Sequence, residues 1–185
     1  MKSKLFLVVL ACFVVVCLPA QEEGTFVPPW RAPVPDVEEG AGLIAIGFWA
    51  DAIGIGLMAG SSAAYSLSFE AGQTLFELGL VSMLLVGNPC LQRGLNDHHD
   101  ALVARGFDVS TEHRDKSQLF SRIALGCGGG AVALGITAAV VQSTGLAIGS
   151  IVVGAAGAVF EIINFYSFRP AWSTDMKIAA GLVEP

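Results

Sequence analysis

The sequence predicts an all-α membrane protein in which four transmembrane helices form two hairpins after an N-terminal signal peptide. Hydrophobic residues make up 54% of the 185 residues and charged residues 14%, whereas soluble domains carry about 25% charged residues. Apolar stretches of roughly 20 residues recur along the chain, which is the length that crosses a hydrocarbon core of about 30 Å. Glycine occurs 22 times, and small residues are favoured where membrane helices approach closely.

Residues 1–20 are predicted to form the signal peptide. A short basic start is followed by the unbroken apolar segment 5–16, and Ala20 precedes a polar residue at a position suited to signal peptidase. The alternatives are an uncleaved anchor and lipidation at Cys12. The order of the three regions favours cleavage after Ala20.

Residues 21–40 are predicted to be an extended extramembrane linker, because prolines and acids crowd this stretch and oppose both a helix and a core. The first transmembrane hairpin follows at residues 41–87. Its first span, 41–60, carries a single charge, and its second span stops at Asn88-Pro89, a strong helix breaker.

Residues 88–118 are predicted to be a polar loop that holds all three histidines. The second transmembrane hairpin occupies residues 119–168, with a tight turn at 142–144 and an aromatic and basic stop typical of the membrane interface. Residues 169–185 are expected to be a short tail. Barrel strands are excluded because they alternate in polarity over about 10 residues, whereas these apolar runs are continuous and longer.

Small residues four positions apart mark candidate helix-packing faces in three of the spans. Packing between the third and fourth spans of the same chain is favoured over a dimerisation face, because such spacings are common in any glycine-rich span. The candidate packing residues are Gly56, Gly60, Gly126, Gly130, Gly145 and Gly149.

The intramembrane polar candidates are Asp51, Glu77 and Arg122, which could converge in a charge-compensated core. An acid at the bilayer centre costs about 2.5–3.5 kcal/mol on insertion scales, so such residues face the bundle interior and find partners. Two interpretations of Asp51 stay open. It is either a proton or cation site, or a hydrogen-bonded structural acid, and the second is favoured.

The segment Asp97-His98-His99-Asp100, with His113 beyond it, raises the question of a metal site. Adjacent side chains on a helix point about 100° apart, and zinc needs three or four convergent ligands. We therefore predict no metal site, no cofactor and no catalytic residue. The glycine run at 126–130 lacks the Lys-Ser/Thr pair of a phosphate-binding loop.

The segment Leu80-Val81-Ser82-Met83-Leu84-Leu85-Val86-Gly87-Asn88-Pro89-Cys90-Leu91-Gln92-Arg93-Gly94 resembles the end of an apolar helix in a loose group of small, uncharacterised, exported bacterial membrane proteins with glycine-rich helical hairpins. The resemblance covers residues 41–106, and the second half of the chain departs from it. It implies architecture and carries no activity.

The distribution of basic residues conflicts with the signal peptide. Export of residue 21 would place the loop 88–118 outside the membrane, yet Lys and Arg near spans tend to stay in the cytoplasm. Five basic residues lie from Arg93 to Arg122, and the short connections have none. The signal peptide is the better supported of the two indications.

The functional expectation is a non-enzymatic, multi-pass protein of the bacterial cell envelope with a structural or assembly role. The alternative is a small transporter or channel-like component that uses intramembrane carboxylates. Expected partners are the lipid bilayer and either a second copy or another envelope protein. The net charge of −6 without a basic stripe excludes nucleic acid, and continuous helical spans favour the inner over the outer membrane.

Overall fold

A computed structural model of the protein describes residues 33–184, and these residues form helices and short connections without a strand. The predicted signal peptide and the first part of the predicted linker lie outside the described residues. The helical elements are α2 (Ala41–Tyr65), α3 (Phe69–Leu80), the π-helix η2 (Val81–Gly87), α4 (Asn88–Ala104), α5 (Glu112–Val141), α6 (Thr144–Ile163), the π-helix η3 (Asn164–Phe168) and α7 (Arg169–Ala179).

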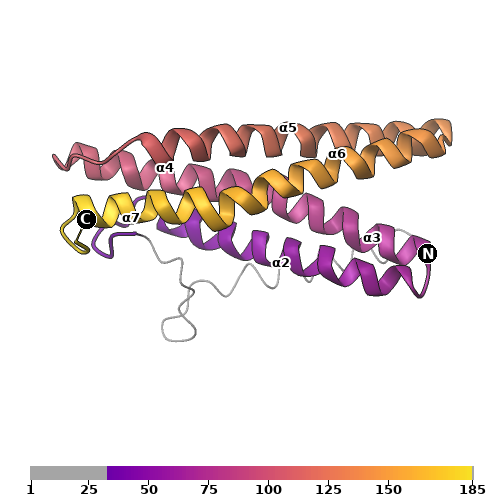
Figure 1. The fold of residues 1–185 in the computed structure, drawn as a ribbon, viewed down its shortest axis with the longest axis horizontal. Coiled ribbons are helices and arrows are strands. Elements are labelled where there is room, and N and C mark those ends of the chain that lie inside the picture. Colours follow the sequence, from indigo (N-terminus) through magenta and orange to yellow (C-terminus); the bar gives the residue numbers. More distant parts are fainter. Residues whose placement is uncertain (1–32, 185) are drawn as a thin grey trace.

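Four long helices result, because the π-helices join their neighbours into the continuous stretches Phe69–Ala104 and Thr144–Ala179. All four are long and apolar enough to cross a membrane, which confirms the predicted all-α class with four spans. They form two antiparallel hairpins (Figure 1). We call the end with the turns 66–68 and 142–143 the hairpin end, and the opposite end the polar end.

Three segments contain more regular structure than the sequence predicted. The expected polar loop 88–118 is helical except at 105–111, and the expected tail 169–185 begins with helix α7. The first span continues to Tyr65, where Ser61 donates a hydrogen bond to the Met58 carbonyl and so satisfies its hydroxyl within the helix. The sequence patterns predict where each apolar run ends. At the polar end, however, the helices continue past the apolar runs, with one side buried and the other exposed.

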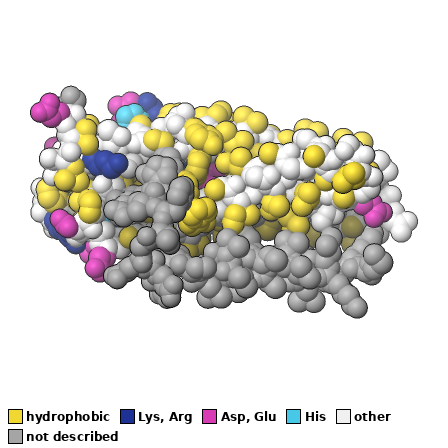
Figure 2. Space-filling model, turned by 90° about the horizontal axis from the view of Figure 1, so that it is seen from below, with side chains coloured by type: hydrophobic (Ala, Val, Ile, Leu, Met, Phe, Trp, Pro, Cys, Tyr) yellow, Lys and Arg dark blue, Asp and Glu magenta, His cyan; other side chains and the backbone are white. Residues whose placement is uncertain are grey.

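Exposed charged side chains are unevenly distributed along the length of the molecule. The exposed charged side chains of the described residues gather at the polar end, except for Glu70 and Glu77 on α3. On the face shown in Figure 2, hydrophobic and uncharged side chains cover most of the described surface of the hairpin-end half. An apolar exterior of this kind suits lipid as the surrounding solvent.

Glycines at seven-residue spacing bring the two helices of the first hairpin into backbone contact. Gly40, Gly47 and Gly54 lie opposite Gly94, Gly87 and Gly79, and a Cβ added to any of these six would collide with the facing helix. The spacing from Gly79 to Gly87 is eight residues, and the π-helix Val81–Gly87 lies within it. Because a π turn holds an additional residue, η2 keeps the glycines of the returning helix in register.

The second hairpin uses small residues in the same way. Gly154 and Gly157 approach α5 and the first hairpin so closely that a Cβ would lie 2.8 Å from Cys127 Cβ at Gly157, and 3.3 Å from Ala131 Cβ at Gly154. Leu84 fills the notch beside Gly128. The two hairpins therefore join at mid-length, where large side chains enter gaps left by glycine.

The six glycines that the sequence predicted as packing residues are not the sites of closest approach between helices. A Cβ at Gly56, Gly60 or Gly126 would meet nothing within 4 Å, and at Gly130 or Gly149 it would make ordinary contacts. Gly145 is near only its own helix cap at Ser143. Four of the six glycines are thus exposed, and Gly130 and Gly149 lie half-buried between α5 and α6, whereas the closest backbone contacts follow the seven-residue pattern.

The second helix of each hairpin contains a π-type backbone hydrogen bond followed by a proline at mid-length. The Asn88 amide donates to the Met83 carbonyl and the Arg169 amide to the Asn164 carbonyl, which are π-type bonds. A proline follows each of them, Pro89 and Pro170, and proline lacks the N–H that regular helix needs. The Asn-Pro and Arg-Pro steps therefore coincide with a change of helical register in each hairpin.

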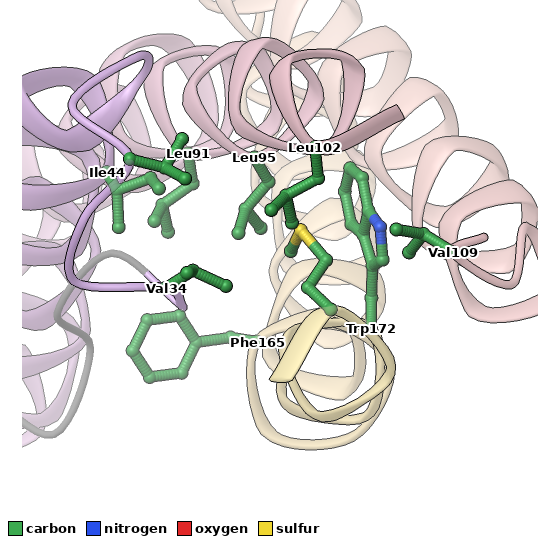
Figure 3. Packing of buried hydrophobic residues seen from close by; sticks show 10 residues of the cluster. Val34, Ile44, Leu91, Leu95, Leu102, Val109, Phe165 and Trp172 are labelled. Atoms are coloured by element: carbon green, nitrogen blue, oxygen red, sulfur yellow. The ribbon is translucent and has the colours of Figure 1, made fainter. Parts of the chain in front are cut away.

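The polar end has its own hydrophobic core, formed by α4, α7 and the segment before α2. Trp172, Met176 and Leu102 are fully buried there, together with Val34 and Val37 (Figure 3). The two valines show that residues 33–40, predicted as part of an extended linker, fold onto the bundle. We call these eight residues the strap.

His98 holds the strap. The Val34 amide donates to His98 Nε2 at 3.1 Å, so His98 Nδ1 carries the ring proton and donates to the Glu39 carbonyl at 3.0 Å. Arg105 adds an exposed ion pair to Glu39 at 3.1 Å. A backbone hydrogen bond and then Arg105 lower the pKa of Glu39, which keeps this carboxylate charged.

We expect the variant His98→Ala to release the strap while the bundle stays folded. One buried and one partly buried hydrogen bond are lost, each worth about 0.5–1.5 kcal/mol. A glutamate-specific protease should then cleave after Glu38 or Glu39 at least ten times faster in the purified protein, as measured by mass spectrometry of the fragments. Arg105→Gln, which removes only exposed contacts, should change the cleavage rate less than twofold. Equal rates in wild type and His98→Ala would contradict the assignment.

Candidate functional site

The most unusual site is a buried ionic cluster formed by Asp51, Asn88, Glu161 and Arg169. Asp51 and Glu161 are 0% exposed and Arg169 is 1% exposed. The Arg169 Nη1 donates to Asp51 Oδ2 at 3.2 Å and to Glu161 Oε1, while Nη2 donates to Asn88 Oδ1 at 2.8 Å. One guanidinium thus links α2, α4 and α6 with α7.

Local structure positions each member of the cluster. Gly87 lies so close to Asp51 that any side chain there would occupy the position of the carboxylate. Asn88 and Arg169 directly follow the two π-helices, and π turns often occur at functional sites. Asn88 is fixed further by Ser121, which donates to its Oδ1, and by its own bond to the Ser121 carbonyl at 2.9 Å.

The charges of the cluster are not balanced when both acids are ionised. Two carboxylates face one guanidinium, and Asp51 Oδ1 and Glu161 Oε2 are buried without a donor from another side chain. A single proton on either acid would make the cluster neutral and supply the missing donor. A charged side chain can stay buried in a membrane helix only when opposite charges and hydrogen bonds offset the cost of removing it from water.

The structure does not bring the three sequence-predicted polar candidates together. Asp51 pairs with Arg169, which also binds Glu161, rather than with Glu77 and Arg122. Glu77 is exposed on α3 and accepts a hydrogen bond from Gln73 at 2.8 Å. Glu161, near the end of α6, is instead the second carboxylate that binds Arg169 in the cluster.

Arg122 is exposed on α5, where it lines a polar groove between α4 and α5. Two further arginines in this groove are already paired, Arg93 with Asp97 at 2.8 Å and Arg114 with Asp100 at 3.0 Å. The groove is therefore largely charge-neutral and belongs to the polar end.

Sequence analysis overlooked Arg169, since it lies in a segment that resembles an interfacial stop. The observation that could have indicated Arg169 is the excess of acids in the apolar spans, because two acids there require a basic partner. The Arg-Pro step after an apolar helix was a second signal.

The histidines have structural partners at the polar end. His99 is buried and its Nδ1 accepts from Trp172 Nε1 at 3.1 Å, while His113 pairs with Asp175 at 2.8 Å. His98 and His99 are therefore core residues, not parts of a solvated loop. Within residues 33–184, no three His, Cys, Asp or Glu side chains converge as metal ligands would.

An open cleft separates the two hairpins in the hairpin-end half. Its volume is about 660 Å³, and it reaches from Phe69 and Ser143 at the turns to Leu85 and Gly128, where the hairpins close. The walls are mainly apolar side chains of α3, α5 and α6, with Gln73 and Glu77 on the α3 side. Figure 1 shows the hairpins apart at this end.

Four apolar helices and an apolar exterior place the chain in the class of multi-pass helical membrane proteins. Comparison with known protein families, with curated proteins and with solved structures finds no match. Its function must therefore be argued from the cluster and the cleft.

Proposed function

We propose that the protein is a non-enzymatic, multi-pass membrane protein with a structural or assembly role in the bacterial cell envelope. The observation that supports this role most directly is Arg169, whose guanidinium binds groups from three other elements. The buried charges thus hold helices together at mid-length, and Asp51 is engaged by a fixed partner rather than open to a mobile ion. A braced bundle with a lipid-facing exterior suits a scaffold.

A small transporter or channel-like component is the second candidate, and the cleft is the specific observation that favours it. The cleft lies between two hairpins that meet from mid-length onward, and it exposes a carboxylate, Glu77. Transport requires a site that reaches both sides of the membrane, whereas the ionic cluster closes the bundle at the inner end of this cleft.

Flux and assembly measurements separate the two candidates. Purified protein in liposomes should leave proton and potassium leak equal to that of empty liposomes, and Asp51→Asn should behave identically. In membranes solubilised with mild detergent, native electrophoresis should find the protein in a discrete complex larger than the monomer. A leak that appears with wild type and disappears with Asp51→Asn or Glu77→Gln would replace the structural role with transport. A strictly monomeric protein would contradict the assembly role.

A further inference from the structure

We propose that the cleft between the hairpins is a binding site for a hydrophobic organic cation, with Glu77 as its counter-charge. This inference goes beyond a structural role, and it names the ligand class that the second candidate function would require. Binding itself depends on neither function.

The position of Glu77 makes it the carboxylate that most needs a partner. It lies eight residues after Phe69, which is about 12 Å along the helix from the hairpin end, within the stretch Phe69–Ala104 that is long and apolar enough to cross a membrane. Glu70, one heptad earlier, lies at the turn and does not line the cleft. Asp51 and Glu161 already share Arg169.

The described residues that line the cleft contribute no positive charge. Among the lining residues within 33–184, Glu77 is charged while Lys, Arg and His do not occur. Gln73 donates to Oε1 of Glu77 and orients the carboxylate; Oε2 accepts no hydrogen bond from residues 33–184. A group that offers a positive charge would therefore complete the site, because opposite charges attract strongly where water is scarce.

The other walls of the cleft indicate that the part of the ligand around its positive charge is apolar. The lining side chains of α5 and α6 are mainly aliphatic, including Val132, Ile136 and Ile148, and the polar Gln142 lies at the turn between the two helices. Pockets of about 300–1,000 Å³ hold ligands of drug size and combine apolar walls with a few polar groups. A bulky apolar body around one positive charge matches this lining, whereas an acyl chain would fill the space and leave the carboxylate unpaired.

Two ions of nearly the same shape provide the test. Full-length protein in nanodiscs of zwitterionic lipid is titrated with tetraphenylphosphonium and with tetraphenylborate, and binding to empty nanodiscs is subtracted. We expect saturable binding of the cation and none of the anion. Glu77→Gln should weaken cation binding at least tenfold, and the matched variant Glu70→Gln should change it less than twofold.

Equal binding of both ions, or full cation affinity in Glu77→Gln, would overturn the proposal. Glu77 is exposed, so the Gln variant is expected to fold, and an unchanged circular dichroism spectrum and melting temperature verify this. Flux is measured separately in liposomes reconstituted with the same purified proteins. Cation binding without flux keeps the site and removes the transport function, while absence of both removes the site as well.

Discussion

Replacing Arg169 with glutamine is expected to lower the free energy of unfolding by about 3–5 kcal/mol, because it leaves two buried carboxylates without their counter-charge. Asp51 and Glu161 would then face each other in a dry site. The measurement is equilibrium unfolding in mixed micelles, followed by circular dichroism. This is the largest effect that we expect from a single substitution in the ionic cluster.

Asp51→Asn is the informative counterpart and should cost no more than about 1 kcal/mol, the value of one hydrogen bond. It keeps the shape of the side chain and leaves one carboxylate opposite one guanidinium, so the cluster becomes neutral. If Arg169→Gln fails to accumulate, Gln or Asn at all three charged positions should restore folding, since a site without charge needs no compensation. If Asp51→Asn and Arg169→Gln lower the free energy of unfolding equally, the expectation that Asp51→Asn leaves the cluster neutral is wrong.

The sequence predicted the hairpins well because their signal is physical and local. Continuous apolar runs of about 20 residues indicate membrane-spanning helices. Because the turns between them are short, the two spans of each pair must be antiparallel. The strap and α7 escaped prediction because their burial depends on residues far away in the chain. Val34, for example, is buried against α4, and its amide bonds to His98, which lies 64 positions later.

The ionic cluster could be predicted only in part. Asp51 was recognisable as an acid in a span, but its partner Arg169 is 118 positions away, and several basic residues were equally plausible from charge alone. The π turns decide the pairing, because they rotate Asn88 and Arg169 into the interior. Each change of register coincides with an Xaa-Pro step. Asn88-Pro89 is predicted from the sequence simply as a helix end, and Arg169-Pro170 enters no prediction.

Gly54→Ala should destabilise the first hairpin by about 1–3 kcal/mol or more, the range for inserting a group into a closely packed core. The added Cβ would lie 2.7 Å from the Gly79 carbonyl oxygen and 2.9 Å from the Met83 amide nitrogen. Both are backbone atoms, so relief requires the two helices to move apart. The melting temperature in detergent should fall, and cross-linking between α2 and α3 should report the wider spacing.

The matched control lies two residues further along the same helix. A Cβ at Gly56 would meet nothing within 4 Å, and alanine has a higher helix propensity than glycine by about 1 kcal/mol, so Gly56→Ala should leave stability unchanged or raise it. Opposite signs at the two positions would establish that the seven-residue spacing, rather than the four-residue motif at Gly56 and Gly60, marks packing within the chain. A loss of stability at Gly56 that depends on protein concentration would instead place a second copy or another partner against this exposed face of α2.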